Sequence, residues 1–174
     1  ETFLSPRATC CAILKVTPIC TIHATTPSFI SAELLADTAP TASKILAEIE
    51  YASVVIATFA FAACDVSRFE GSGFLVARDE GLMMTACSWS SSKWSHLGEG
   101  PIEFIRVSAG HIDDNRPFEL PDDELVERLL QELQWLIDLN AEPLEVRVTR
   151  WPKSLPQYHP GHLERVATIN EALT

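Results

Sequence analysis

Glycine is scarce in this sequence: seven occur among 174 residues, and none precedes residue 71. A loop that cradles phosphate needs closely spaced glycines that lead into a helix N-terminus. Neither Gly71-Ser72-Gly73 nor Gly98-Glu99-Gly100 is followed by the third glycine of a dinucleotide-binding turn. The sequence therefore offers no turn that would bind the pyrophosphate of a dinucleotide.

Long apolar runs are also missing. The longest, Val54 to Cys64, is too short to cross a bilayer. The N-terminal apolar stretch is broken by Arg7 and Lys15, which argues against a signal peptide. The chain starts at Glu1 and its first methionine is Met83, so we expect it to begin inside a larger reading frame.

Positive charge is the third scarcity. Lysine and arginine number 13 against 24 aspartates and glutamates, for a formal net charge of −11. The basic residues form no stripe, and phosphate backbones are bound by clustered Lys and Arg. Nucleic acid is therefore not an expected partner. Much of the acidic excess lies between Asp122 and Asp138, which predicts the solvated face of one helix.

The five cysteines do not suggest a disulfide framework, since their number is odd and Cys10 adjoins Cys11. A reducing, cytoplasmic setting is therefore predicted. Cys10, Cys11, Cys20 and His23 contain zinc-ligand residue types, but their spacing is not that of a structural zinc site, so no metal is expected.

Hydrophobic periodicity predicts an α+β domain with a mixed, mostly antiparallel sheet covered by helices. Residues 1–26 support at most two weak strands. The expected helices are 29–36, with Ile30, Leu34 and Leu35 on one face, a second through 44–49, one that begins at 122, and a last one with the face Leu163, Val166, Ile169 and Leu173. The expected strands are 52–62, 71–77, 82–89, 102–110 and 144–151. Residues 78–81 form the turn of a hairpin, 113–121 are a polar connection, and prolines make the segment after 151 an extended crossing.

Side chains with their own chemistry are few. Ser90, Ser91 and Ser92 lack a nucleophile elbow, and the nearest histidine, His96, lies in the same loop, so a serine triad is not expected. His159 and His162 have the spacing of one helix face and could bind a metal, but we interpret them as residues at a helix start. No catalytic residue is assigned.

Three stretches carry a family resemblance. They are ATTPSFISAELLADTAP (24–40), EGSGFLVARDEGLMMTACSWSSSKWSHL (70–97) and RVTRWPKSLPQYHPGHLERV (147–166). Together they resemble protoporphyrinogen and coproporphyrinogen oxidases of the flavin amine oxidase superfamily, particularly Gram-positive members. The resemblance covers roughly residues 24 to 174 in order and spacing, whereas residues 1–23 do not match.

The resemblance implies FAD as cofactor, a tetrapyrrole as substrate and molecular oxygen as electron acceptor, in heme biosynthesis. It assigns 1–26 to a poorly matched segment, 27–158 to the sheet and helices of a substrate domain, and 159–174 to the start of the helix that leads back to the FAD-binding domain. Both terminal FAD-binding segments of the family are missing, so the chain alone is expected to be inactive. No transmembrane segment is implied, and peripheral membrane contact of the full enzyme stays open.

By the same resemblance Trp151 contacts FAD, and Leu75 lines the substrate cavity. Gly73 lies on the same strand face as Leu75, where a missing side chain would leave room for the macrocycle. Val107 on the third strand is a further substrate-binding candidate. From the residues alone, Trp151 is equally well interpreted as a core aromatic at a strand end.

Other residues keep a structural interpretation. Trp89 and Trp94 are expected to be core or edge aromatics, and Arg150 and Lys153 solvated charges. The competing function is a non-catalytic sheet module that binds a hydrophobic ligand or partner. A third is an amine oxidase or carotenoid desaturase of the same superfamily, against which the WSSSKW and LPQY elements argue.

Overall fold

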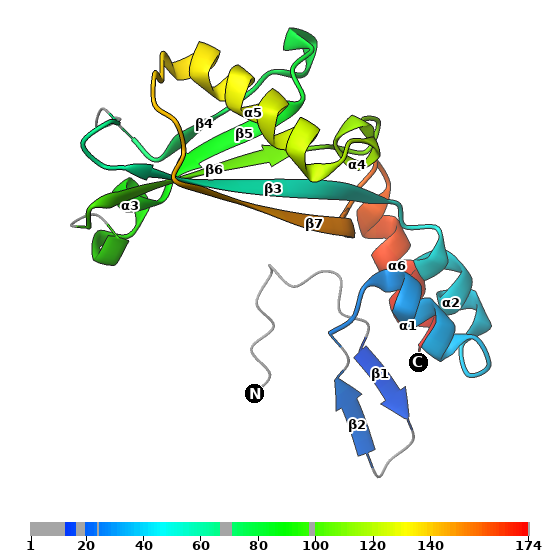
Figure 1. Ribbon diagram of the computed structural model, residues 1–174. Coiled ribbons are helices and arrows are strands. Elements are labelled where there is room, and N and C mark those ends of the chain that lie inside the picture. Colours follow the sequence, from blue (N-terminus) through cyan, green and yellow to red (C-terminus); the bar gives the residue numbers. More distant parts are fainter. Residues whose placement is uncertain (1–12, 17–19, 24, 67–70, 98–99, 174) are drawn as a thin grey trace. The chain divides into compact units, whose positions relative to one another are not determined.

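The computed structural model describes residues 13–16, 20–23, 25–66, 71–97 and 100–173 (Figure 1). The chain forms two compact units. One comprises Glu1–Tyr51 and Pro156–Thr174, and the other Ala52–Leu155. The second unit contains most of the sheet and is called the sheet unit below. The domain boundaries predicted above concern a complete enzyme and stay a prediction.

Five strands form one sheet in the order β4-β5-β6-β3-β7. They are β3 (Tyr51–Ala62), β4 (Gly73–Leu75), β5 (Met84–Trp89), β6 (Ile102–Ala109) and β7 (Glu145–Pro156). The pairs β4–β5, β5–β6 and β3–β6 are antiparallel. The backbone N–H of Leu144 donates to the carbonyl of Ala60, and that of Lys153 donates to Ser53 Oγ, so β7 runs antiparallel to β3 as well. The predicted α+β fold and the grouping of the five strands are confirmed.

Helix α5 (Asp122–Ile137) lies along one face of this sheet (Figure 1). Three acidic residues occupy its first turn, where they favour the helix dipole. Leu125, Leu129 and Leu133 recur at intervals of four and are fully buried, and each contributes roughly 1.5–3 kcal/mol of burial energy. Their partners in the core are alternate residues of the strands, including Phe59, Phe61, Cys87, Ile105 and Val107.

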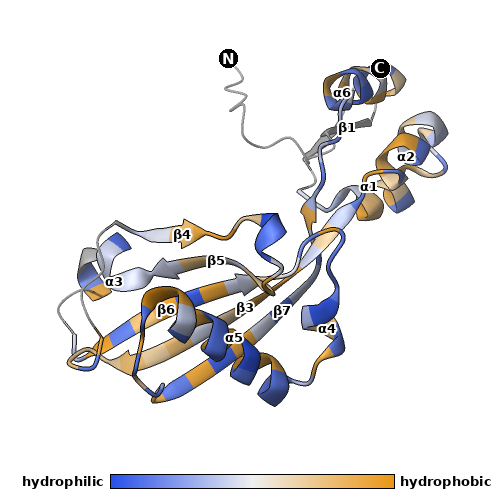
Figure 2. Cartoon of the chain, turned by 90° about the horizontal axis from the view of Figure 1, so that it is seen from above, coloured by the Kyte–Doolittle hydropathy of each residue, from blue (hydrophilic) through white to orange (hydrophobic). Residues whose placement is uncertain are grey.

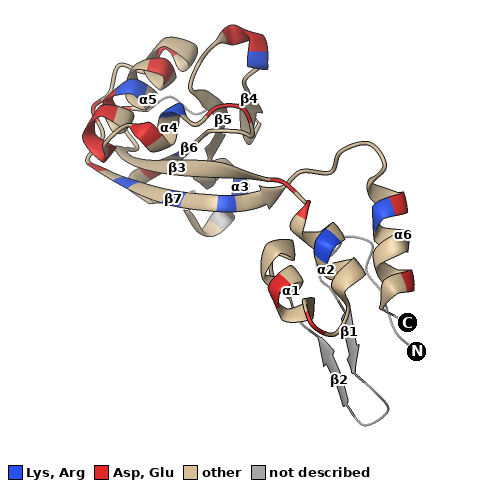
Figure 3. Cartoon of the chain, turned by 90° about the vertical axis from the view of Figure 1, so that its right-hand side faces the viewer, with Lys and Arg blue, Asp and Glu red and all other residues tan. Residues whose placement is uncertain are grey.

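The outer side of α5 is polar. Figure 2 shows hydrophilic residues along the helix, and Figure 3 shows acidic residues on it. The acidic run therefore forms a largely solvated helix face, as predicted. One exception is Glu132, which is 5% exposed.

The other unit is built on α1 (Ser28–Leu35), α2 (Pro40–Ala47) and α6 (His162–Ala172). Its core contains Leu35, Ala42, Leu46, Ile49 and Ile169. The strands β1 (Ile13–Val16) and β2 (Cys20–His23) pair antiparallel, which confirms two short strands in the N-terminal region. Cys10 and Cys11 lie outside the described residues.

Two predicted helix faces need correction. Leu34 of α1 and Leu163 of α6 were expected on apolar faces, but they are 58% and 77% exposed. Both helices bury a narrower stripe than their sequences suggest, because each packs on one side only, mainly through Leu35 and Ile169.

The segment after residue 151 is a further correction. The strand was expected to end at residue 151 and to be followed by an extended crossing, but β7 continues to Pro156. Lys153 adopts a positive φ of 47° after Pro152, and its N–H still finds Ser53 Oγ at 3.0 Å. The positive φ of Lys153 lets β7 continue beyond Pro152 while it remains hydrogen-bonded to β3. The polar connection 113–121 also contains a short helix, α4 (Arg116–Glu119).

Arg150 is not the solvated charge that the sequence suggested. Its guanidinium donates to the carbonyls of Pro117 at 2.6 Å and Leu120 at 2.9 Å, and also to the carboxylate of Asp122. It thereby joins β7 to the residues between α4 and α5, and its side chain is 29% exposed.

Candidate functional site

The face of the sheet opposite α5 is the candidate site, and it is called the open face below. In the register of β4, β5 and β6, Leu75 pairs with Ala86 and Ala86 with Ser108. In the same way Gly73 pairs with Ser88, and Ser88 with Arg106. Paired residues point to one side of a sheet, and alternate residues of these strands belong to the core under α5. These six residues therefore face away from α5.

Two grooves follow this face. The large groove has a volume of about 900 Å³, and its lining includes Val54, Leu75, Leu155, His111 and the loop residues Asp113 to Arg116. The small groove has a volume of about 360 Å³, and its lining includes Gly73, Ser88, Lys93 and Arg106. Leu75, Ala86 and Ser108 line both, so the grooves adjoin.

Leu75 lies where the two grooves meet. Leu75 is the last residue of the edge strand β4 and is 84% exposed, a high exposure for a large apolar residue. Exposure of this kind suits an apolar ligand that covers the residue when bound. The position agrees with the role expected for Leu75, and that role stays a prediction.

Gly73 lines the small groove, but the physical reason for a glycine differs from the expected one. Its φ of 146° is accessible mainly to glycine, and a Cβ built on it would lie 2.2 Å from the carbonyl oxygen of Cys87. A side chain here would therefore collide with the β5 backbone. The pairing of β4 with β5 requires the glycine, whether or not a ligand uses the space nearby.

Val107 is not brought together with Gly73 and Leu75. It is fully buried on the α5 side, in register with Ala57 and Cys87. Its neighbours Arg106 and Ser108 reach the open face instead, and the sequence argument missed both. The signal was present in Ile105-Arg106-Val107-Ser108-Ala109, where apolar and polar residues alternate as in a half-buried strand.

Trp151 extends from β7 and is 51% exposed. Val146 and Val148 of the same strand pack on the core, so alternation places Trp151 on the open face. It is therefore not a core aromatic. Its half-exposed ring is free to pack against a flat ligand, and contact with a flavin stays a prediction.

The stretch WSSSKW contains two tryptophans in different environments. Trp89 is 5% exposed, and its indole N–H donates to the carbonyl of Gly71 at 3.0 Å. Trp94 is 56% exposed. Of the two tryptophans, only Trp89 is therefore a core residue. Between them the serines form a one-turn helix, α3 (Ser90–Lys93), on the side of the sheet away from α5 (Figure 1).

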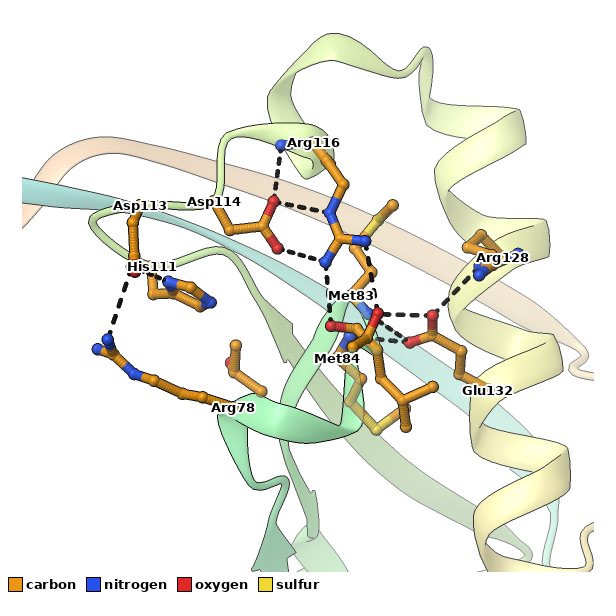
Figure 4. Close-up of polar contacts among 12 residues, drawn as sticks. Arg78, Met83, Met84, His111, Asp113, Asp114, Arg116, Arg128 and Glu132 are labelled. Carbon is orange, nitrogen blue, oxygen red and sulfur yellow. Dashed lines mark hydrogen bonds and ion pairs between the residues drawn. The ribbon is translucent and has the colours of Figure 1, made fainter.

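A polar network fixes the wall of the large groove (Figure 4). Arg116 donates to the buried carboxylate of Asp114 through Nε at 2.9 Å and Nη2 at 2.7 Å. These hydrogen bonds are the main reason that the pKa of Asp114 is below its ordinary value. Arg116 also donates to the carbonyl of Leu82 at 3.2 Å, so it joins the 111–116 loop to the start of β5.

At the rim of the large groove, His111 Nδ1 lies 2.5 Å from a carboxylate oxygen of Asp113, and Arg78 lies 3.6 Å from the same oxygen. The hydrogen bond with His111 is the leading cause of a lowered pKa of Asp113. In the core, burial raises the pKa of the Cys87 thiol to about 12, so this cysteine is a packing residue rather than a nucleophile.

Among the residues that the structure describes, no group of three or more His, Cys, Asp and Glu side chains is arranged to hold a metal ion. No helix of the described chain combines the length and apolar character needed to cross a bilayer.

Comparison with known proteins identifies the family. Residues 19–168 match the model of the flavin containing amine oxidoreductases. The chain belongs to this family. The match includes the whole sheet unit, so the open face belongs to a flavin-containing amine oxidoreductase.

Several amine oxidoreductase relatives carry the name coproporphyrinogen III oxidase. The Bacillus subtilis protein is 36% identical over 104 residues, which are 60% of this chain and 22% of that protein. The Staphylococcus aureus protein is 34% identical, over 58% of this chain and 22% of its own length. The Propionibacterium freudenreichii protein is 34% identical over 82% of this chain and 27% of its own length. The chain thus spans about a quarter of the curated relatives that it matches.

Solved structures agree with the family. A protein from Exiguobacterium sp. 255-15, provisionally assigned as a protoporphyrinogen oxidase, superposes with a TM-score of 0.70 at 25% identity, over 96% of this chain and 37% of that one. Reduced UDP-galactopyranose mutase superposes with a TM-score of 0.53 at 9% identity over 75% of this chain and 28% of its own, a similarity of fold alone.

Proposed function

We propose that the protein carrying this chain is an FAD-dependent oxidase that converts coproporphyrinogen III to the porphyrin, with molecular oxygen as acceptor. The observation that carries the proposal is the match to proteins named coproporphyrinogen III oxidase within a flavin-containing family. Protoporphyrinogen IX is the alternative substrate. The reaction would belong to heme biosynthesis, in the cytoplasm.

The apolar part of the open face supports the proposal. The macrocycle is broad and apolar, with carboxylates at its rim, so it needs an apolar surface with few polar groups near its centre. Leu75, Ala86 and Val54 supply apolar surface along the grooves. The residues of the chain would hold the macrocycle and exclude water, which explains why sequence reasoning found no catalytic acid or base.

Trp151 is the residue of this chain best suited to hold a flavin ring, since its flat side chain is half exposed on the open face. A flavin held there would supply the two-electron acceptor for each of the three oxidations that separate a porphyrinogen from the porphyrin, and molecular oxygen would take the electrons on. The glycine pattern provides no cradle for the pyrophosphate, so Trp151 would contribute contact with the ring only.

The proposal is tested with the complete protein that carries this chain. We expect chemically reduced coproporphyrinogen III to be oxidised, with a rise in porphyrin fluorescence, consumption of oxygen and formation of peroxide. Protoporphyrinogen IX, supplied at the same concentrations, should be oxidised with a lower kcat/KM. Failure to accelerate oxidation of either porphyrinogen above the spontaneous rate would contradict the function.

A further inference from the structure

The small groove concentrates positive charge in an acidic protein. Arg106 of β6 and Lys93 of α3 both line it, and among the described residues no aspartate or glutamate does. The large groove differs, because Asp113, Asp114 and Glu119 accompany its basic residues. A local excess of cations within a chain of net charge −11 indicates a site for an anionic group.

Neither cationic side chain has a partner within the described fold. Arg116, Arg128, Arg147 and Arg150 each have a carboxylate partner in the structure. Within the described chain, the side chains of Arg106 and Lys93 form neither a hydrogen bond nor an ion pair with another residue. Both are exposed at the groove surface, so their charged groups are available to a ligand.

The fold sets the backbone positions of the two cations. Arg106 lies in the middle of β6, between Ser88 of β5 and Thr58 of β3. Lys93 belongs to α3, whose Ser91 hydroxyl donates to the carboxylate of Glu103 on β6. The hydroxyls of Ser72, Ser88 and Ser108 also line the groove and can donate to an anion. The β6 pairing and the α3 contact therefore fix the backbone positions from which both cations reach the groove.

Size indicates which part of a ligand enters. About 360 Å³ is too little for a whole tetrapyrrole but adequate for substituents at its edge. The adjoining large groove, which shares Leu75, Ala86 and Ser108, can receive the macrocycle. A ligand that covers Leu75 would thus bring its rim to Arg106 and Lys93.

We propose that Arg106 and Lys93 bind carboxylates at the rim of the porphyrinogen and thereby select the more highly carboxylated substrate. This inference rests on the proposed function. Coproporphyrinogen III carries a propionate on every pyrrole ring, whereas protoporphyrinogen IX carries apolar vinyl groups in place of some of them. Cations in this groove favour the former, since a vinyl group leaves them without a partner.

The test uses the complete protein with Arg106→Gln, Lys93→Gln and the double variant. Each single variant should raise KM for coproporphyrinogen III by roughly three- to tenfold, with kcat within about twofold, because binding is lost and the reacting carbons are untouched. KM for protoporphyrinogen IX should change less, and the selectivity between the two substrates should fall. Arg106→Lys, which keeps the charge, should retain most of the selectivity.

Arg147→Gln is the matched control, since it removes one positive charge from an exposed residue of the same sheet that lines neither groove. Equal changes of KM for both substrates, or the same change in the control, would overturn the inference and leave the proposed function intact. Loss of bound FAD from the Arg106 or Lys93 variants, measured by flavin absorbance, would assign the cations to the cofactor phosphates and also overturn it. Failure of the unmodified protein to oxidise either porphyrinogen would instead remove the function itself.

Discussion

Glu132 on α5 accepts a hydrogen bond of 2.8 Å from the backbone N–H of Met84 at the start of β5. The same buried carboxylate accepts from the N–H of Met83, and Arg128 donates to it at 3.2 Å (Figure 4). These N–H groups precede the regular pairing of β5 with β6 and would otherwise be buried without a partner. A side chain of the helix thus completes the hydrogen bonding at the start of β5, beside the large groove.

Replacing Glu132 by glutamine should lower the free energy of unfolding by about 1–3 kcal/mol, because the amide NH₂ would face a backbone donor. Urea denaturation of the chain measures this loss. Glu127→Gln is the matched control on the same helix, since Glu127 is exposed and only accepts from Gln131. An equal effect of the two substitutions would show that the backbone contacts of Glu132 do not matter.

The ion pair of Asp114 and Arg116 should make stability depend on pH. Hydrogen bonds from Arg116 lower the folded-state pKa of Asp114, so the stabilisation is present above the unfolded pKa, near 3.8, and is lost as the pH falls through the folded value. Free energies of unfolding measured from neutral pH down to about pH 2 should therefore decline less steeply for Asp114→Asn. Asp79→Asn, in the exposed 78–80 turn, should leave the slope unchanged.

Val107 and Leu75 should respond oppositely to truncation. Val107→Ala empties space in the core and should lower the free energy of unfolding by about 1–3 kcal/mol. Leu75→Ala removes an exposed side chain and should change stability by less than about 0.5 kcal/mol. In the complete protein, Leu75→Ala should raise KM for the porphyrinogen. A stability loss at Leu75 as large as that at Val107 would show that Leu75 is a packing residue.

Trp151→Ala in the complete protein should weaken retention of FAD and slow porphyrinogen oxidation. Because Trp151 is half exposed, its removal should lower stability by less than the roughly 3–5 kcal/mol typical of a buried aromatic. Thermal unfolding and flavin absorbance after desalting measure the two effects. Trp135→Ala, at a 71% exposed position on α5, is the control and should leave flavin retention unchanged. Unaltered cofactor affinity at Trp151 would remove the proposed flavin contact.

The isolated 174-residue chain should neither retain FAD nor oxidise a porphyrinogen. Its glycines do not form the turn that places backbone N–H groups around a pyrophosphate. The visible spectrum of the purified chain, recorded after incubation with FAD and desalting, tests this. A retained flavin band together with oxidase activity would contradict the prediction.

The sequence by itself determined the main elements. Leucines at intervals of four defined α5, and unbroken β-branched and aromatic residues defined β3, because these periods reflect local backbone geometry. The stretches around Gly73 and Trp151 were sufficient to indicate the family, since their spacing is a property of the sequence alone. Partners distant in sequence were not predictable: nothing near Arg150 indicated that it would bind the carbonyls of Pro117 and Leu120.

Only the tertiary structure decided which side of the sheet is covered. Alternation along β6 separates Val107 from Arg106 and Ser108, but it does not say which side faces a ligand. That choice depends on where α5 packs, and its buried leucines take Val107 into the core and leave Arg106 on the open face. A helix can cover only one face of a sheet. The packing of α5, a segment distant in sequence, therefore made Val107 a core residue and left Arg106 exposed beside Leu75 and Gly73.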